Sequence, residues 1–393
     1  MRSTVPSSLL DGGGGDEDRR KDLVSSVYWW RSLAEFDDRG RPEAFSSTAS
    51  AGLTPRLRVV RELERLAVLA HESLDNLRHK LLTYRAGDLW FPAGGIPKQE
   101  TDIPPVITIL LLGFVGSGKS SLINLMYSVF GRSGFVPFAH TASRAGKDGR
   151  TQYLEEHSVS RSMRNGFCVF DSRGLDYDRV AEGLVEVAEW MEHGVRHRQP
   201  CRGAALPEPA FAVPSLASSS ATATAKRFVR RQVNCAMVVV DLLELHRSLV
   251  SGDLRPLEAT RELFHSPSIN NYGTDENPIL VLTHGDELTA EERIETRVRA
   301  CDYMGVPETA GVYDVVCVNE HGLLADEMDP VTAYAVAEAV YRGLLLADRG
   351  HPPKPIIRDW LILVLSRSMC TLSAVFAFLS ACCSKIAKAC NEK

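Results

Sequence analysis

One loop holds the residues best suited to phosphate chemistry: residues 113–120, GFVGSGKS, match the pattern GxxxxGK[ST] in full. Its glycines let the backbone adopt positive φ and approach phosphate groups closely. Lys119 can neutralise β- and γ-phosphate oxygens, and the Ser120 hydroxyl can bind Mg²⁺. An apolar run precedes the loop and an apolar-periodic helix follows it, so the helix N-terminus adds partial positive charge. We therefore expect a polyphosphate site; the alternatives are a chance match and a degenerate loop that binds nothing.

A second candidate element is the segment 166–174, GFCVFDSRG, in which an apolar strand ends at Asp171. Parallel sheets bind ligands at the carboxyl ends of their strands, so this carboxylate can hold Mg²⁺ through a water. The spacing Asp-x-x-Gly lets the backbone N–H of Gly174 face a γ-phosphate and respond to its loss. Turns also use Asp and Gly freely, so an ordinary turn is the alternative.

A third element, Thr-His-Gly-Asp at 283–286, follows another apolar run. The Asp286 carboxylate can accept hydrogen bonds from N1–H and the 2-amino group of guanine, a pattern that adenine cannot supply. The element resembles the [NT]KxD motif of guanine-nucleotide proteins, with His284 in place of Lys; an imidazole can stack on the base instead. The alternative is an ordinary turn that caps the helix starting near Thr289.

Two further positions complete the candidate site. The strand expected at 312–318 leads to Asn319, where a backbone amide would meet the guanine 6-oxo group. Thr151, just before the second strand, is the candidate switch threonine, Thr141 is a weaker one, and either can instead belong to a turn or cap. The residues expected to bind the nucleotide are Gly113, Val115, Gly116, Ser117, Gly118, Lys119, Ser120, Ser121, Asp171, Gly174, Thr283, His284, Asp286 and Asn319. The expected Mg²⁺ ligands are Ser120, Thr151 and Asp171, and the expected catalytic residues are Lys119, Thr151 and Gly174.

The elements that position these loops alternate between apolar, β-branched runs and helical patterns. This alternation predicts a doubly wound, mostly parallel α/β sheet of the P-loop NTPase class over residues 104–347. Residues 202–225, rich in Ala, Ser and Pro, predict a flexible surface insertion. Strands are expected at 106–112, 153–160, 167–171, 233–241, 278–283 and 312–318, and helices near 119–130, 178–193, 255–264, 289–304 and 330–346.

The N-terminal part divides into two segments. Residues 1–54, rich in Gly, Ser, Asp and Arg, predict a mostly disordered lead in which Tyr28, Trp29 and Trp30 could still dock. Residues 55–90 contain an amphipathic helix over 55–84. Its apolar stripe predicts packing on its own domain; the alternative is self-association or binding of a protein effector. The stripe consists of Val59, Leu63, Leu66, Ala70, Leu74, Leu77 and Leu81.

The C-terminal tail, 356–393, is apolar and holds four of the nine cysteines. Residues 360–383 carry one charge, Arg367, in 24 residues, enough at about 1.5 Å per residue to cross the hydrocarbon core of a bilayer. The sequence thus predicts membrane contact; the alternatives are an interfacial segment held by acylated cysteines and a helix packed on the domain. The tail cysteines are Cys370, Cys382, Cys383 and Cys390.

Composition excludes several protein classes. The 393 residues include 45 Lys+Arg and 50 Asp+Glu, a formal net charge of −5, so no nucleic-acid partner is expected. A hydrophobic fraction of 44% with 24% charged residues excludes a wholly disordered or collagen-like chain. The cysteine number is odd, no CxxC pair occurs and no apolar secretory leader begins the chain, so we expect a reducing, cytoplasmic setting.

The order of the motifs allows a family comparison. GxxGSGKSS, TQY, FCVFDSRGL, NCAMVVVD, VLTHGDEL and VVCVNE follow one another over about 104–347. This order resembles the G domain of the interferon-induced protein 44-like GTPases, within the dynamin-like and septin-like P-loop class. The resemblance implies binding of guanine nucleotides, GTP or GDP, and a mixed sheet whose second strand runs antiparallel.

Hydrolysis is expected to be slow. In small GTPases a Gln after Asp-x-x-Gly orients the attacking water, whereas Leu175 stands here and cannot form a hydrogen bond through its side chain. We therefore expect a Mg²⁺-dependent GTP switch with weak intrinsic turnover, or one that hydrolyses GTP on self-association. The alternatives are a P-loop ATPase or kinase, and a nucleotide-binding scaffold without significant turnover.

Overall fold

The computed structural model describes residues 28–33, 54–92, 97–131, 139, 152–159, 166–202, 228–270, 277–316, 329–351, 354, 365–378 and 380–381. The chain divides into two compact units. The larger unit comprises Met1–Trp90 with Pro104–Gly350, and the smaller one Phe91–Ile103 with His351–Lys393.

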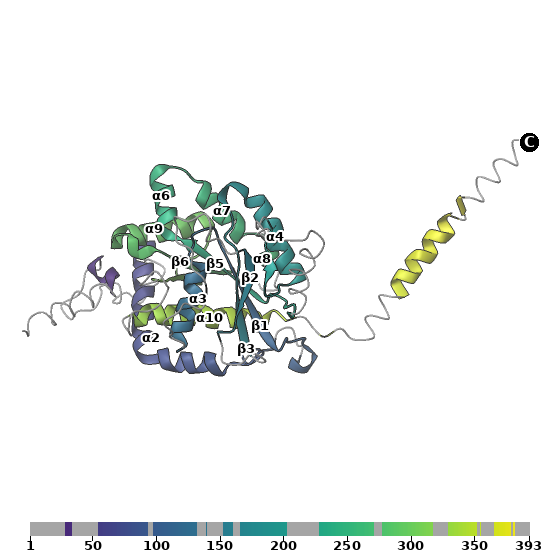
Figure 1. The fold of residues 1–393 in the computed structure, drawn as a ribbon, viewed down its shortest axis with the longest axis horizontal. Helices are drawn as coiled ribbons and strands as arrows, with labels where there is room; N and C mark the ends of the chain where they lie inside the picture. The colour runs from purple at the N-terminus through teal and green to yellow at the C-terminus, as the bar shows by residue number, and fades with distance from the viewer. Residues whose placement is uncertain are drawn as a thin grey trace, which may run out of the picture. The chain divides into compact units, whose positions relative to one another are not determined.

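The larger unit is built on a mixed sheet of seven strands among the described residues, in the order β4-β2-β3-β1-β5-β6-β7. Figure 1 shows helices packed around this sheet. β1 runs parallel to β3 and β5, and β6 runs parallel to β5 and β7. β2 is antiparallel to both of its neighbours, as the family resemblance implied. The strands are β1 (Val106–Leu112), β2 (Tyr153–His157), β3 (Gly166–Asp171), β4 (Gln199–Pro200), β5 (Cys235–Asp241), β6 (Ile279–Thr283) and β7 (Val312–Asp314).

Helices cover both faces of this sheet, because successive side chains of its buried strands point to opposite sides. On β1, Ile109 belongs to one apolar core and Leu110 to the other. α2, α3 and α10 pack in the first core, and α4, α6, α7 and α8 in the second; α9 contributes to both. The doubly wound α/β prediction is therefore confirmed. The helices are α2 (Pro55–Thr83), α3 (Lys119–Val129), α4 (Val180–His193), α6 (Leu242–Ser251), α7 (Arg255–Phe264), α8 (Pro267–Asn270), α9 (Ala290–Met304) and α10 (Pro330–Arg349).

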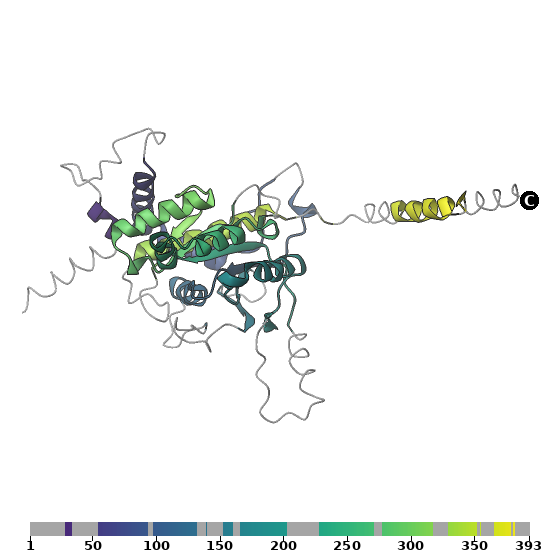
Figure 2. The ribbon, with the colours of Figure 1, turned by 90° about the horizontal axis from the view of Figure 1, so that it is seen from above.

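Helix α2 lies beside α10 (Figure 1; Figure 2). Its stripe is buried apart from the half-buried Leu77. At its end the buried Asp348 of α10 accepts hydrogen bonds from the Tyr84 hydroxyl and from the backbone N–H groups of Gly87 and Leu89, each at 2.9 Å. The interpretation of this stripe as a surface for a partner helix is therefore wrong: the helix packs on its own domain.

A short 3-10 turn, η1 (Trp29–Leu33), docks on α2 and α9. Trp30 is 1% exposed, and its Nε1 donates to Glu64 of α2 at 2.8 Å. Arg31 forms two hydrogen bonds to the same carboxylate. Part of the segment expected to be disordered is therefore anchored in the domain; the rest of residues 1–53 lies outside the described residues.

The smaller unit is described in short pieces. Lys354 contacts the 3-10 turn η4 (Lys98–Glu100), and its backbone N–H donates to Glu100 O at 2.6 Å. Residues 365–378 form a helix, on which Leu365, Met369 and Phe376 are exposed. None of the helices formed by the described residues is both long and apolar enough to cross a membrane. The rest of the predicted segment 360–383, apart from 380 and 381, lies outside the described residues.

Candidate nucleotide-binding site

The P-loop, residues 113–120, joins the end of β1 to the first turn of α3. Gly113 has φ of 155°, and a Cβ there would lie 2.2 Å from the Val239 carbonyl oxygen of β5. Gly118 is the left-handed N-cap of α3, with φ of 81°. Both positions therefore require glycine, and the loop turns its backbone toward the helix N-terminus, where N–H groups can meet an anion.

Lys119 is buried inside this loop. Its Nζ donates to Gly113 O at 3.1 Å, Phe114 O at 3.0 Å and Ser117 Oγ at 3.3 Å. Burial lowers the pKa of Lys119 from 10.5 to about 8, with the nearby Asp171 carboxylate acting in the opposite direction. All three acceptors are neutral oxygens, so a phosphate anion would be a stronger partner for the ammonium.

Ser120 and Asp171 form a pair beside the P-loop. The Ser120 hydroxyl donates to Asp171 Oδ2 at 2.5 Å, whereas Oδ1 is buried without a hydrogen-bond partner. Burial raises the pKa of Asp171 to about 6, and the Ser120 hydrogen bond and Lys119 oppose that shift. An unsatisfied carboxylate oxygen next to a hydroxyl fits Mg²⁺, which prefers oxygen ligands. The described residues contain no group of three or more His, Cys, Asp or Glu that could hold a metal ion.

The loop after β3 is joined directly to the P-loop. The Val115 N–H donates to Leu175 O at 2.9 Å, and the Leu175 N–H donates to Gly113 O at 3.0 Å. A Cβ on Gly174 would lie 2.5 Å from the Val115 Cα, so only glycine permits this approach. Leu175 itself is 1% exposed and packs beneath Gly183 of α4. The structure thus brings the Asp-x-x-Gly segment against the P-loop; whether the Gly174 N–H faces a γ-phosphate stays a prediction.

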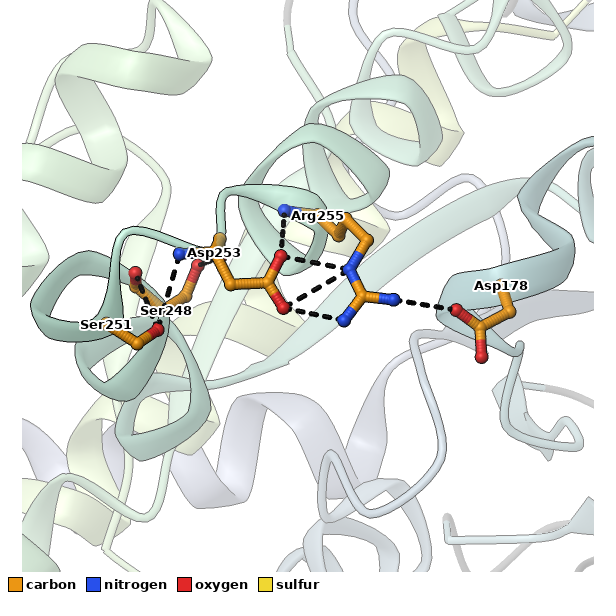
Figure 3. A network of polar contacts seen from close by, with 5 residues as sticks. All are labelled: Asp178, Ser248, Ser251, Asp253 and Arg255. Atoms are coloured by element: carbon orange, nitrogen blue, oxygen red, sulfur yellow. Dashed lines mark hydrogen bonds and ion pairs between the residues drawn. The ribbon is translucent and has the colours of Figure 1, made fainter.

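Farther from the P-loop, a network of polar contacts links the segment after Asp-x-x-Gly to the start of α7 (Figure 3). Asp178 lies in the 3-10 turn η5 (Tyr177–Arg179) that follows the Asp-x-x-Gly segment, and it accepts a hydrogen bond from Arg255 Nη1 at 3.2 Å. Arg255, at the start of α7, also binds Asp253 at 2.7 Å. These side chains are exposed, so each pair adds little stability, but the network joins η5 to the turn between α6 and α7.

The turn at residues 283–286, called the base turn after its predicted role, lies at the end of β6 next to the P-loop. The Thr283 hydroxyl lies 2.9 Å from Ser117 O and 3.1 Å from Val240 O. A Cβ on Gly118 would stand 3.4 Å from His284 Cε1, so the imidazole lies against the start of α3. His284 is in the left-handed region, with φ of 56°, and Asp286 is exposed on the 3-10 turn η6 (Gly285–Glu287).

Asp241 lies in the candidate site, although sequence reasoning did not select it. It ends β5, caps α6 by accepting from Glu244 N at 3.1 Å, and places Oδ1 3.5 Å from His284 Nδ1. The available signal was its position at the end of the apolar run NCAMVVVD, the same signal that selected Asp171 at the end of β3.

Most predicted site residues meet at one edge of the sheet, where β1, β3 and β6 end. Ser121 lies with Lys119 and Ser120 in the first turn of α3. Two predicted residues, Thr151 and Asn319, lie outside the described residues, as does Thr141. The P-loop after β1, the parallel core of the sheet and the antiparallel β2 together make this the fold of a P-loop G domain.

No protein-family model matches the sequence, and no curated protein matches it. Among solved structures, the chain is similar to a dimerization-deficient mutant of Toc33 from Arabidopsis thaliana. The match has 13% sequence identity, covers 77% of this chain and 97% of that chain, and has a TM-score of 0.26. A likeness this weak supports no conclusion about function, and the fold assignment rests on the strand order and the loops described above.

Proposed function

We propose that this protein is a Mg²⁺-dependent guanine-nucleotide-binding switch with slow intrinsic GTP hydrolysis. The contact between Thr283 and Ser117, at 2.9 Å, carries the proposal, because it joins a base-reading turn to a phosphate-binding loop. Because the two loops are in contact, a single nucleotide can bind both, with its phosphates at the P-loop and its base at the base turn.

The phosphate side of the site uses the P-loop and Lys119, with backbone N–H groups at the start of α3. Ser120 and Asp171 would hold Mg²⁺, which supplies charge neutralisation at the β- and γ-phosphate oxygens when bound. Thr151 remains our candidate for the switch threonine, and Gly174 for the backbone group that responds to the γ-phosphate.

The base side of the site uses the base turn. Asp286 is exposed and can accept from N1–H and the 2-amino group of guanine. His284 presents an imidazole beside the P-loop, where it can pack on the base, and Asn319 would follow from the next strand. Guanine carries these two donors and adenine does not, so a carboxylate at position 286 favours guanine. This preference separates the proposal from a P-loop ATPase or kinase.

Slow hydrolysis is supported by Leu175, which is buried and offers no group to orient water. Nucleotide state would then act mainly as a conformational signal, with faster turnover requiring self-association. A scaffold that binds GTP without turnover is the competing interpretation, and single-turnover measurement of phosphate release at high and low protein concentration separates the two.

We further propose a cytoplasmic location with membrane contact through the tail. Exposed Leu365, Met369 and Phe376 on the helix at 365–378 support it. Carbonate extraction of the full chain should leave protein in the pellet, whereas a chain ending at Pro355 should be released. Full release of both chains would contradict membrane contact.

Competition binding tests the nucleotide proposal. The full chain is used, because α2 is part of the domain core. Excess GTP and GDP should displace labelled GTP in the presence of Mg²⁺, and ATP should not. Lys119→Ala should weaken binding at least about tenfold, Asp286→Asn should lose the preference for guanine, and Glu287→Gln serves as the neighbouring control. Equal competition by ATP would instead favour the ATPase or kinase alternative.

A further inference from the structure

The side chain of Arg293, on α9, packs against the base turn at Gly285. A Cβ built on Gly285 would lie 2.6 Å from Arg293 Nε and 3.0 Å from its Cζ. The guanidinium therefore occupies the space that a side chain at position 285 would need. Gly285 lies between His284 and Asp286, so a shift of Arg293 would move the residues that face the base.

Arg293 is itself held in one position. It is 4% exposed, and its Nε and Nη2 donate to the two carboxylate oxygens of Asp314 at 2.8 and 2.6 Å. Asp314 ends β7 and pairs in register with Leu282, the residue before the base turn. Such a two-point contact between a planar guanidinium and a carboxylate restricts both position and orientation.

One face of this guanidinium is covered by Trp29, whose ring centroid lies 4.0 Å from Arg293 Cζ. A planar guanidinium can bind a carboxylate in its plane and stack on an aromatic ring through its face. Trp29 belongs to η1, 264 residues away in the sequence, and the neighbouring Trp30 and Arg31 fix that turn to Glu64 of α2. The turn η1, which is far from the P-loop in sequence, thus contacts Arg293, the residue that packs against the base turn.

The charges around Arg293 are consistent with a fixed support. Asp314 is its ion-pair partner, and the Asp329 carboxylate at the start of α10 also interacts with it electrostatically. Removing the indole would open one face of the guanidinium to water without removing these acidic partners. The expected consequence is a looser base turn in a domain that still folds.

We propose that Trp29, acting through Arg293, is a positioning residue for the base turn, so that docking of η1 sets the affinity and selectivity for guanine. The inference rests on the proposed function. It concerns base recognition only, because none of the contacts above involves Lys119, Ser120 or Asp171.

Binding of GDP and ADP to four versions of the full chain tests this inference. Trp29→Ala should weaken GDP binding about five- to tenfold while changing ADP binding much less, since coupling between neighbouring elements is commonly of that size. Trp29→Phe, which keeps an aromatic face, should restore most of the GDP affinity. Tyr28→Phe, which removes only the hydroxyl 2.7 Å from His71 Nε2, should match the wild type.

A measurement on the unaltered chain covers the case in which Trp29→Ala does not fold. If η1 and the base turn are coupled, linkage requires GDP to stabilise η1, so amide exchange in residues 28–33 should slow with GDP. An unchanged exchange rate there, or a folded Trp29→Ala with GDP affinity within about twofold of wild type, overturns the inference alone. A wild type that binds ADP as well as GDP overturns both the inference and the proposed function.

Discussion

The Ser120 hydroxyl donates to Asp171 Oδ2 at 2.5 Å, while the other carboxylate oxygen of Asp171 is buried without a partner. The two residues come from different elements, the first turn of α3 and the last position of β3. Their contact therefore places oxygen atoms from both elements side by side next to the P-loop. In the proposed Mg²⁺ site, the charge of this carboxylate would decide whether the cation can bind.

The pair predicts a pH-dependent requirement for Mg²⁺. Burial raises the pKa of Asp171 from 3.8 to about 6. Without Mg²⁺, the contribution of this shift to folding stability is therefore present below pH 3.8 and is lost as pH rises through about 6. Mg²⁺ needs the ionised form, so the gain in GDP affinity caused by Mg²⁺ should fall as pH drops below about 6. Titration of GDP with and without Mg²⁺ between about pH 5 and 8 measures this gain.

The matched variants for this prediction are Asp171→Asn and Asp178→Asn. The first should abolish the Mg²⁺ effect and its pH dependence, because an amide neither ionises nor binds Mg²⁺ well. The second changes an exposed carboxylate of η5 and should keep the wild-type profile. An Mg²⁺ effect that survives in Asp171→Asn would place the metal elsewhere.

From the pKa of Lys119 we predict a second pH effect: GDP affinity should fall as pH rises, whereas the Mg²⁺ effect falls as pH drops. Its pKa is lowered from 10.5 to about 8, so the stability associated with the neutral amine is present above pH 10.5 and lost as pH falls through about 8. Phosphate favours the charged amine, so GDP binding above pH 8 should take up a proton, and affinity should fall by at most about tenfold per pH unit.

Calorimetry in buffers of different ionisation enthalpy detects this proton uptake between about pH 7 and 9. Lys119→Arg keeps a charged side chain throughout this range, so its affinity should lose the Lys119 contribution to the pH dependence. Equal proton uptake in wild type and Lys119→Arg would assign the proton to another group.

Local patterns predicted much of this molecule. The glycines at 113 and 118 and the apolar run before them specify a strand, a loop and a helix start within a short segment. The same reasoning found the strand end at Asp171. Each of these features depends on neighbours in sequence, which is why spacing alone was informative.

Features that depend on tertiary contacts were missed. α6 was not predicted because Leu242 follows β5 without a loop, so its apolar residues extend the pattern of the strand. The stripe on α2 shows that a surface is buried, but periodicity does not identify α10 as the partner. The stacking of Trp29 on Arg293 leaves no local pattern either, since it joins residues on separate elements.

Thr283 predicts a coupling between the base turn and the P-loop. Thr283→Val keeps the shape of the side chain but removes the hydroxyl that contacts Ser117 O and Val240 O. The loss should cost about 1–3 kcal/mol of stability, because a buried acceptor loses its partner. GDP affinity should also fall, since the two loops lose their direct contact.

Urea unfolding and GDP titration of the same preparations measure both effects, and Thr283→Ser, which retains the hydroxyl, is the control. The serine variant should stay close to wild type in affinity. If Thr283→Val binds GDP as tightly as Thr283→Ser, the hydroxyl contact does not contribute to nucleotide binding.

Leu175 predicts that a glutamine at this position would not create a fast GTPase. The side chain is 1% exposed, and the backbone on both sides is committed to the P-loop, so a glutamine amide would be buried rather than directed at a water near the γ-phosphate. Leu175→Gln should therefore destabilise the domain by about 2–4 kcal/mol, from lost apolar burial and an unsatisfied amide. The rate of GTP hydrolysis should stay at the wild-type level.

Leu175→Met, which nearly conserves volume, should cost less than about 1.5 kcal/mol and also leave hydrolysis unchanged. Urea unfolding and single-turnover phosphate release on both variants separate packing from catalysis. A rise in hydrolysis of about tenfold or more in Leu175→Gln would mean that the side chain leaves the core in the GTP-bound state, because about 1.4 kcal/mol of barrier reduction requires contact with the reacting water. In that event the proposed slow turnover would follow from the identity of residue 175 alone, and the proposal would no longer need self-association.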